Sequence, residues 1–150
     1  MNKITGTIIT LNNETVIEDC IISLKKICNE IIVLDSLSSD KTISIAKNLG
    51  AKIYEQEFLG DGPQKKLASS YASNDWVFSL DSDERLEDDL IDFVQNLDLD
   101  ASSFKAYSFK RRNFCGSKWI KAASFYPDRV IRLYNKKYVN YNLSTSHAFI

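Results

Sequence analysis

Strand and helix patterns alternate over the first eighty residues of this 150-residue chain, and this alternation most restricts its fold. Apolar, β-branched runs indicate strands, and apolar residues at helical spacing indicate helices. The expected strands are Ile4–Leu11, Glu30–Leu34, Lys52–Glu57 and Trp76–Leu80, and the expected helices cover 17–28, 38–50 and 64–72. Ser38 or Ser39 should cap the second helix. The alternation predicts an α/β fold with a largely parallel, doubly wound sheet, in which ligands bind beyond the carboxyl ends of the strands.

The pattern changes after Asp98. Phe104–Asn113 and Arg129–Asn135 resemble strands, but no strong helix pattern separates them, which favours a short antiparallel extension. With 44% hydrophobic and 26% charged residues, the composition is that of a globular domain, and no low-complexity linker divides it. We therefore expect one domain over 1–150, with a parallel half at 1–97 and an irregular half at 98–150.

The net charge and the cysteines restrict partners and compartment. A formal net charge of -1 gives no overall positive field, so we expect no nucleic-acid partner. Cys20, Cys28 and Cys115 lack metal-site spacing, which is typical of free thiols in a reducing cytoplasm, and the first two should face the core. Residues 1–11 hold no apolar run long enough for a signal peptide or a membrane span. Their alternating Ile and Thr residues predict a strand instead.

Three carboxylates, Asp81, Asp83 and Glu84, directly follow the fourth strand pattern. Carboxylates this close repel one another, and Mg²⁺ or Mn²⁺, which prefer oxygen ligands, offset that repulsion. An acidic turn that opens a helix explains the segment equally well, since Asp and Glu favour the first helical turn. An EF-hand loop is excluded, because Leu86 stands where that loop needs glycine and Asp92 where it needs glutamate.

The other strand ends carry further polar side chains, namely Thr10, Asn12 and Glu14 after the first strand and Asp35 after the second. Because parallel strands end at the same edge, these residues and the acidic cluster should converge on one rim. Neither early strand-to-helix turn is rich in glycine, which argues against a dinucleotide fold or a P-loop, so a metal must hold any phosphates. For Asp35 alone, a role as helix cap or turn former is favoured. Beside a metal site, it gives the set that a nucleoside-diphosphate sugar requires.

Taken in order, these segments resemble the inverting glycosyltransferases of family 2, which have the GT-A nucleotide-binding fold, and most closely the lipopolysaccharide core glucosyltransferase-like branch. The resemblance covers nearly the whole chain. It is carried by Ile8-Ile9-Thr10-Leu11-Asn12-Asn13-Glu14, Asp35-Ser36-Leu37-Ser38-Ser39-Asp40-Lys41-Thr42, Gly60-Asp61-Gly62-Pro63-Gln64-Lys65 and Leu80-Asp81-Ser82-Asp83-Glu84. The segments that look like the acceptor side of that branch are Arg111-Arg112-Asn113-Phe114, Lys118-Trp119-Ile120, Tyr126-Pro127-Asp128 and Arg132-Leu133-Tyr134.

The resemblance implies a GT-A type, Rossmann-like sheet and a role for each rim residue. Residues 1–97 would bind the nucleotide sugar, and 98–150 would form the acceptor side. The nucleotide would be bound by or lie near five residues, namely Thr10, Asn12, Glu14, Asp35 and Lys65. Asp81 and Asp83 would form an Asp-x-Asp element that serves nucleotide and metal, with Asp83 as the direct ligand of Mg²⁺ or Mn²⁺.

Two departures from the branch concern catalysis and length. The branch carries a His-Glu pair near 146–148, but here His147 is followed by Ala148, so the expected acidic general base is replaced. Asp128 and His147 are the remaining titratable candidates, with a surface or core role as the alternative for His147. The chain also ends at Ile150, earlier than expected for a complete member, so the acceptor-side half is expected to be incomplete.

The resemblance thus implies metal-assisted, inverting transfer of a hexose, with glucose from UDP-glucose favoured, to a lipopolysaccharide-core or other glycan acceptor. One alternative is a sugar-nucleotide-binding module that has lost transfer, and a weaker one is a metal-dependent phosphohydrolase built on Asp81 and Asp83. The basic, aromatic stretch Lys110–Lys121 suits a lipid-linked acceptor or peripheral contact with the cytoplasmic face of an inner membrane. Its alternative is an exposed strand with solvated charges.

Overall fold

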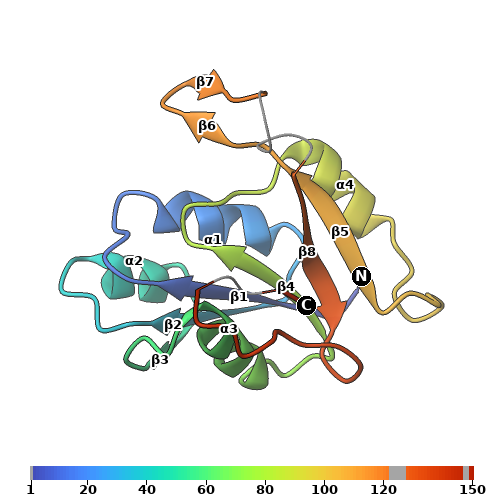
Figure 1. Ribbon diagram of the computed structural model, residues 1–150, viewed down its shortest axis with the longest axis horizontal. Helices are drawn as coiled ribbons and strands as arrows, with labels where there is room; N and C mark the ends of the chain where they lie inside the picture. Colours follow the sequence, from blue (N-terminus) through green and yellow to red (C-terminus); the bar gives the residue numbers. More distant parts are fainter. Residues whose placement is uncertain (1, 122–127, 147–148) are drawn as a thin grey trace.

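A six-stranded mixed sheet with the order β3-β2-β1-β4-β8-β5 forms the centre of the computed structural model, which describes residues 2–121, 128–146 and 149–150 (Figure 1). The strands of this sheet are β1 (Ile4–Thr10), β2 (Glu30–Asp35), β3 (Lys52–Glu55), β4 (Trp76–Asp81), β5 (Ala106–Arg111) and β8 (Asp128–Asn135). The first four run parallel, whereas β8 is antiparallel to both β4 and β5. The predicted parallel sheet with an antiparallel extension is therefore confirmed.

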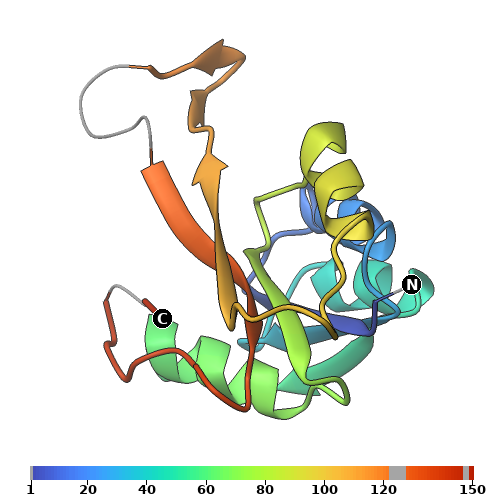
Figure 2. The same ribbon diagram turned by 90° about the vertical axis from the view of Figure 1, so that its right-hand side faces the viewer.

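Helices cover both faces of the sheet, as predicted. They are α1 (Ile17–Lys25), α2 (Thr42–Asn48), α3 (Asp61–Ser70) and α4 (Asp88–Gln95). Helix α3 lies on one face, while α1, α2 and α4 lie on the other (Figures 1 and 2). Asp88 and Asp89 occupy the first turn of α4, so the acidic segment does open a helix, but only after the cluster at 81–84 has ended.

The central strands are buried on both faces, which explains their nearly continuous apolar character. Ile4 and Ile8 of β1 and Phe78 of β4 have no exposed surface. The buried stripe of α1, which includes Cys20, packs against this layer. Gly6 allows close contact there, because a Cβ at this position would stand 2.8 Å from Ile31 Cδ1. Cys20 and Cys28 are buried free thiols, as expected, and Cys115 is an exposed one.

The strand register brings the carboxyl ends of three strands together. Thr10 pairs with Asp35, and Ile9 pairs with Asp81, so the two aspartates flank the end of β1 on either side. The convergence of the predicted rim residues follows from this register.

The pairing of β4 with β8 is short and leaves an opening in the sheet. Only Trp76–Phe78 pair with β8, opposite 133–135. Past Phe78, β8 continues beside β5 as far as the Arg111 and Asp128 pair, with one irregularity between Tyr107 and Ser108. The end of β4 and the facing part of β8 therefore form two separate walls.

A small hairpin, β6 (Phe114–Cys115) and β7 (Lys118–Trp119), projects beyond the end of β5 (Figure 2). Gly116 lies in its turn with a φ of +59°. No helix among the described residues is both long and apolar enough to cross a membrane.

Candidate functional site

Asp35 forms the turn after β2. Its Oδ2 accepts the Ser38 backbone N–H at 2.6 Å, and its Oδ1 accepts the Ser38 hydroxyl at 2.5 Å. The carboxylate is fully buried. The turn-forming alternative is thus seen directly, while a contact of Asp35 with a nucleotide stays a prediction. Neither Ser38 nor Ser39 caps α2 as expected, because the helix begins only at Thr42, with Lys41 at the N-cap position. The Ser38 hydroxyl instead binds Asp35 and accepts the Asn12 N–H at 2.8 Å.

The loop after β1 is fastened to the loop after β2 by the residues predicted at the first strand end. Asn12 has a left-handed backbone with a φ of +52°, and its Oδ1 accepts the Ser39 N–H at 2.8 Å. Glu14 accepts the Lys41 N–H at 2.9 Å, while its own N–H donates to Asp40 Oδ2 at 3.1 Å. These bonds hold the two loops as one rigid edge of the rim.

Asn13 joins the same rim to the acidic turn. Its Oδ1 accepts the Thr10 hydroxyl at 3.1 Å and the Ser82 hydroxyl at 2.7 Å. Its backbone N–H donates to Thr42 Oγ1 at 2.8 Å. Thr10 and Ser82 are both buried, so Asn13 links the ends of β1 and β4 from inside. We had not predicted this role, although the amide directly follows Asn12 in the quoted motif.

Asp81 lies between two buried cations. Its Oδ1 is 2.8 Å from Lys65 Nζ, and its Oδ2 is 3.3 Å from Arg132 Nη2. The side chains of Lys65 and Arg132 are only 6% and 8% exposed. Burial opposes the charged form of Asp81, but Arg132 and Lys65 outweigh it and lower the pKa of its carboxyl. Asp81 is therefore a fixed anion with both oxygens engaged.

Lys65 and Arg132 keep their positive charge because nearby carboxylates outweigh the effect of burial. Burial alone would lower the pKa of Lys65 and of Arg132. Asp81 outweighs burial at Lys65, and Glu84 and Asp81 together do so at Arg132, so the pKa of each base is raised. Lys65 also lies 3.1 Å from Asp61 Oδ1 on the first turn of α3.

Asp83 differs from Asp81, because it is exposed and makes no hydrogen bond or ion pair with any described residue. No group of three His, Cys, Asp or Glu side chains in the described part of the chain could hold a metal by itself. Mg²⁺ commonly binds through one or two carboxylates together with substrate phosphates. The donor set fits a metal that arrives with a diphosphate, with Asp83 as the protein ligand and Asp81 held back by its two cations.

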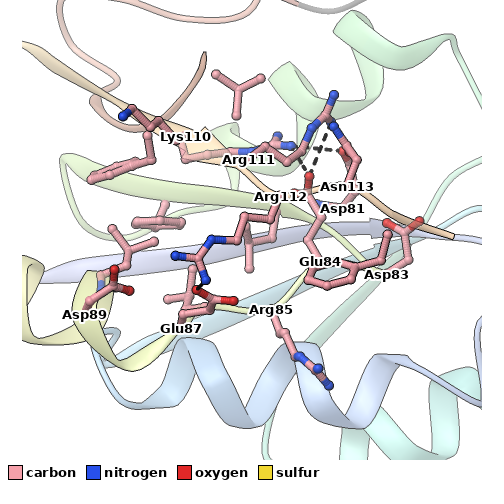
Figure 3. Close-up of a pocket in the computed structure, with 18 of the residues that line it drawn as sticks. Asp81, Asp83, Glu84, Arg85, Glu87, Asp89, Lys110, Arg111, Arg112 and Asn113 are labelled. Carbon is pink, nitrogen blue, oxygen red and sulfur yellow. Dashed lines mark hydrogen bonds and ion pairs between the residues drawn. The ribbon is translucent and has the colours of Figure 1, made fainter. Parts of the chain in front are cut away.

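A large open cleft begins at this turn. It measures about 1320 Å³ and lies between the 81–89 segment on one side and β5 and β8 on the other. Figure 3 shows Asp83, Glu84, Glu87 and Asp89 along one wall and the basic residues of 110–112 along the other. Its apolar lining residues include Phe78, Leu80, Phe93 and Phe109. The cleft offers both apolar surface and charges of both signs.

Asp128 is the first residue of β8 and precedes Arg129, which lines the cleft. Its Oδ2 is 2.7 Å from Arg111 Nη2 and 2.9 Å from Arg111 Nε, and it accepts a weaker bond from Asn113 Nδ2 at 3.5 Å. All three contacts use the same oxygen. The predicted role of Asp128 as general base is not tested by this arrangement, and the other candidate, His147, lies with Ala148 outside the described residues.

The amino terminus of α3 is covered by the segment 142–145. The Asp61 and Gly62 N–H groups donate to the carbonyl oxygens of Thr145 at 3.1 Å and Ser144 at 2.9 Å. A Cβ at position 62 would stand only 2.3 Å from the Asn142 carbonyl oxygen. The glycines of the Gly60-Asp61-Gly62 motif therefore permit this close backbone contact.

Besides Asn13, three site residues were missed from the sequence, namely Arg132, Arg111 and Glu84 in its structural role. Arg132 and Arg111 lie on the antiparallel strands, where residue spacing gives no information about the end of β4. Their presence in segments that resemble the acceptor side of the family was the available signal. The structure adds that Arg132 contacts the Asp-x-Asp element itself.

Comparisons with known proteins show the family of this chain. The model of the family described as Glycosyl transferase family 2 matches residues 7–149. The uncharacterized glycosyltransferase RT0209 of Rickettsia typhi is 39% identical over 145 residues, which is 94% of this chain and 49% of that protein. The lipopolysaccharide core biosynthesis glycosyltransferase LpsC of Rhizobium meliloti is 28% identical over 142 residues, which is 91% of this chain and 52% of that protein.

The fold is also found in solved structures. The S. aureus TarS 1–349 structure aligns with 97% of this chain and 52% of its own, with a TM-score of 0.62 and 15% identity, which shows a shared fold. The same protein was solved in complex with UDP-GlcNAc, with a TM-score of 0.53 and 24% identity over 63% of this chain and 30% of that one. The chain spans about half the length of the relatives named above. Because the family model covers nearly all of it, the chain belongs to glycosyl transferase family 2.

Proposed function

We propose that this chain binds the UDP-sugar of an inverting glycosyltransferase, with Mg²⁺ or Mn²⁺ held at Asp83. The observation that carries the proposal is the Asp83 carboxylate, which has no partner among the described residues, beside the fixed Asp81 at the sheet edge that also bears Asp35. The transferred sugar is a hexose, with glucose favoured, and the acceptor is a lipopolysaccharide-core or other glycan. Because the chain spans about half the length of these relatives, the activity of the whole protein is part of the proposal.

The nucleotide would lie along the rim formed by the loops after β1 and β2. Asp35 is fully buried and binds Ser38 through both oxygens, so it shapes the loop against which the base or ribose would lie, and a direct contact requires this turn to open. Asn12 and Glu14 fix this loop pair, and Thr10 lies beneath it. TarS, which has the same fold, was solved with UDP-GlcNAc. That ligand supports a uridine nucleotide as the first one to test.

The diphosphate would lie above the acidic turn. A metal at Asp83 would neutralise the negative charge that the departing diphosphate gains. Lys65, with its raised pKa, keeps a positive charge next to the same turn. Asp81 holds that lysine in place and is itself partly exposed between its two buried cations.

The acceptor would enter the cleft between the 81–89 segment and the β5 and β8 strands. Inversion requires the acceptor oxygen to attack the anomeric carbon from the face opposite the diphosphate while a base removes its proton. Asp128 and His147 are the candidate bases. The apolar lining at Phe93 and Phe109 suits the hydrophobic face of a sugar ring or part of a lipid.

The hairpin β6–β7 supports the same acceptor class. Phe114 is 54% exposed, and the Trp119 ring lies between Arg112, 5.1 Å from the ring centroid, and Lys121, 4.2 Å from it. Basic and aromatic side chains together suit phosphate groups and the interface of an anionic membrane. We therefore extend the proposal to a lipid-linked acceptor and a location at the cytoplasmic face of the inner membrane.

Calorimetry of UDP binding in the presence of Mn²⁺ and then of EDTA tests the donor site. We expect metal to strengthen binding at least tenfold, and Asp83→Asn to remove most of that gain, because the substitution takes away the charged oxygen ligand. Asp88→Asn is the matched control, since Asp88 is exposed on α4 and pairs with Lys26 on the surface. Equal UDP affinity with metal and with EDTA would show that the metal role is wrong.

A transfer assay separates binding from chemistry. UDP-sugars are supplied with core-oligosaccharide or lipid-linked acceptors, and we expect this chain to bind nucleotide but to transfer slowly, because Ala148 replaces the acidic member of the expected pair. Loss of a general base typically removes about 10² to 10⁴ in rate. Rapid turnover by the unmodified chain would refute that defect. Loss of turnover in Asp128→Asn but not in His147→Ala would identify Asp128 as the base.

A further inference from the structure

We propose that Arg132 is a positioning residue of the sugar-nucleotide site. From the antiparallel strand β8 it holds the 81–84 turn, and through that turn it presents Asp83 to the metal and the diphosphate. The inference rests on the function proposed above and adds to it a residue that no site prediction had included.

Arg132 occupies the gap where β4 and β8 separate. Its neighbour Leu133 forms the last pair with β4, opposite Phe78, and Arg132 is the first residue beyond that pair. The guanidinium fills this gap, since only 8% of the side chain is exposed. One nitrogen, Nη2, lies 3.3 Å from Asp81 Oδ2 and 2.5 Å from Glu84 Oε1. A single cation thus bridges both ends of the turn.

The Arg132 bridge keeps the two end residues of the turn close enough to bind each other. The Glu84 N–H donates to the Asp81 carbonyl oxygen at 3.0 Å, and the Asp81 N–H donates to Glu84 Oε2 at 3.2 Å. The first bond joins the two backbones, and the second keeps the Glu84 carboxylate beside the Asp81 backbone, although the two side chains carry like charges. Removal of a buried counter-ion is strongly unfavourable for the charges left behind. Without Arg132, the two carboxylates would repel, and the turn would open.

Asp83 lies inside this turn and has no contact of its own with the described residues that could hold it. Its position is therefore set by its neighbours on either side. Residues that support a metal ligand from outside commonly change metal affinity by 10- to 100-fold when they are replaced. Arg132 supplies this support from the opposite side of the turn.

The same bridge reaches the acceptor side of the cleft. Glu84 Oε1 also lies 3.4 Å from Arg111 Nη1, and Arg111 pairs with Asp128 at 2.7 Å. The turn is thus held by side chains from both β8 and β5, which form the wall facing it. This explains why a residue in an acceptor-side segment acts on the sugar-nucleotide site.

The test compares Arg132→Gln with Arg132→Lys and with Arg129→Gln as a matched control. Arg129 lies on the same strand, is exposed, and donates only to the Ser108 hydroxyl among the described contacts. We expect Arg132→Gln to weaken Mn²⁺-dependent UDP binding about 10- to 100-fold. UDP binding in EDTA should stay within about twofold. Arg132→Lys should recover part of the loss, because lysine keeps the positive charge but lacks the planar guanidinium with its several N–H donors.

Amide hydrogen exchange gives a second readout that does not need nucleotide. We expect faster exchange at the Asp81 and Glu84 amides in Arg132→Gln, while the amides of β1 stay protected. Wild-type-like UDP binding with Mn²⁺ and unchanged exchange at 81 and 84 would overturn the positioning role. If the wild-type chain itself shows no metal-dependent UDP binding, the proposed function fails, and the exchange result alone then decides whether Arg132 fixes the turn. Should Arg132→Gln not fold, Arg132→Lys carries both measurements.

Discussion

The two ends of the parallel sheet each bear a carboxylate bound to lysine, but the two sites are built differently. At the amino end, Glu30 accepts hydrogen bonds from Lys52 at 2.6 Å, the Thr5 hydroxyl at 2.6 Å and the Ser73 N–H and hydroxyl at 2.9 and 2.8 Å. At the carboxyl end, Asp81 is paired with Lys65 and Arg132, while Asp83 beside it has no partner among the described residues.

This difference separates a stabilising site from a binding site. Glu30 accepts four hydrogen bonds from inside the domain, three of them on Oε2, so its carboxylate serves the packing of the amino end. The carboxyl end instead keeps one anion free at the mouth of a large cleft, next to two fixed cations. We expect substitutions at the amino end to change stability alone, and those at the carboxyl end to change nucleotide binding as well.

Phe78 lies midway between the two ends and should give the largest loss of stability. Its ring has no exposed surface and stacks 5.7 Å from Phe109. We expect Phe78→Ala to lower the free energy of unfolding by about 3 to 5 kcal/mol, because it leaves a cavity in the core. Urea unfolding measures this. Phe58→Ala, at a 58% exposed position, is the control and should change stability by no more than about 0.5 kcal/mol. An equal loss in both variants would contradict the assigned core.

Glu30→Gln should destabilise the domain by about 1 to 3 kcal/mol, since it weakens hydrogen bonds to a charged group that is only 8% exposed. UDP affinity with Mn²⁺ should stay within about twofold of wild type. Glu18→Gln is the matched control for both measurements, because Glu18 is exposed on α1. A loss of UDP affinity in Glu30→Gln, measured well below its melting temperature, would break the distinction between the two ends.

Gly62→Ala should cost about 1 to 3 kcal/mol, because its Cβ would meet the Asn142 carbonyl oxygen at 2.3 Å and force the backbone apart. Gly50→Ala at the amino end is the comparison. Gly50 has a φ of +79° and no atom within 4 Å of a Cβ, so only backbone strain of about 1 kcal/mol applies. Hydrogen exchange distinguishes the two mechanisms. The Asp61 and Gly62 amides, which donate to the 144–145 carbonyls, should exchange faster in Gly62→Ala alone.

Much of the fold could be predicted because periodicity reports burial locally. The apolar runs at β1 and β4 are the two central strands of the six-stranded sheet, and the amphipathic spacing of 17–28 contains α1. The position of β8 beside β4 could not be predicted in this way. It depends on a pairing of Phe78 with Leu133 across more than fifty residues, and no local pattern encodes such a contact.

The candidate site was predictable where it follows strand ends and not where it depends on side chains from elsewhere. Asp35 and Asp81 lie at the same edge, as the parallel register requires. The sequence did not show that Asp35 binds Ser38 or that α2 begins only at Thr42, so neither Ser38 nor Ser39 is the expected helix cap. It also did not show Arg132, because a guanidinium reaches the 81–84 turn only through the separation of two strands.

The pH dependence of the amino-end network is the smallest effect, since it is a part of the Glu30→Gln loss. Burial opposes the charged form of Glu30, but hydrogen bonds from Lys52, Thr5 and Ser73 outweigh it and lower its pKa from 4.5 to about 2. When folding lowers the pKa of a carboxyl group, the group stabilises the folded state fully at a pH above its pKa in the unfolded chain. This stabilisation is lost as the pH falls towards the pKa in the folded chain.

The difference in unfolding free energy between wild type and Glu30→Gln should therefore be constant from pH 7 to about pH 5 and shrink between pH 4.5 and about 2. Below that range a protonated Glu30 resembles the glutamine that replaces it. Urea unfolding of both proteins at pH 7, 4 and 3 measures the change, and acid effects common to both cancel in the difference. A difference that stays constant or grows down to pH 3 would mean that the charged form of Glu30 is not what the network stabilises, and the contrast with Asp81 would then have to rest on ligand binding alone.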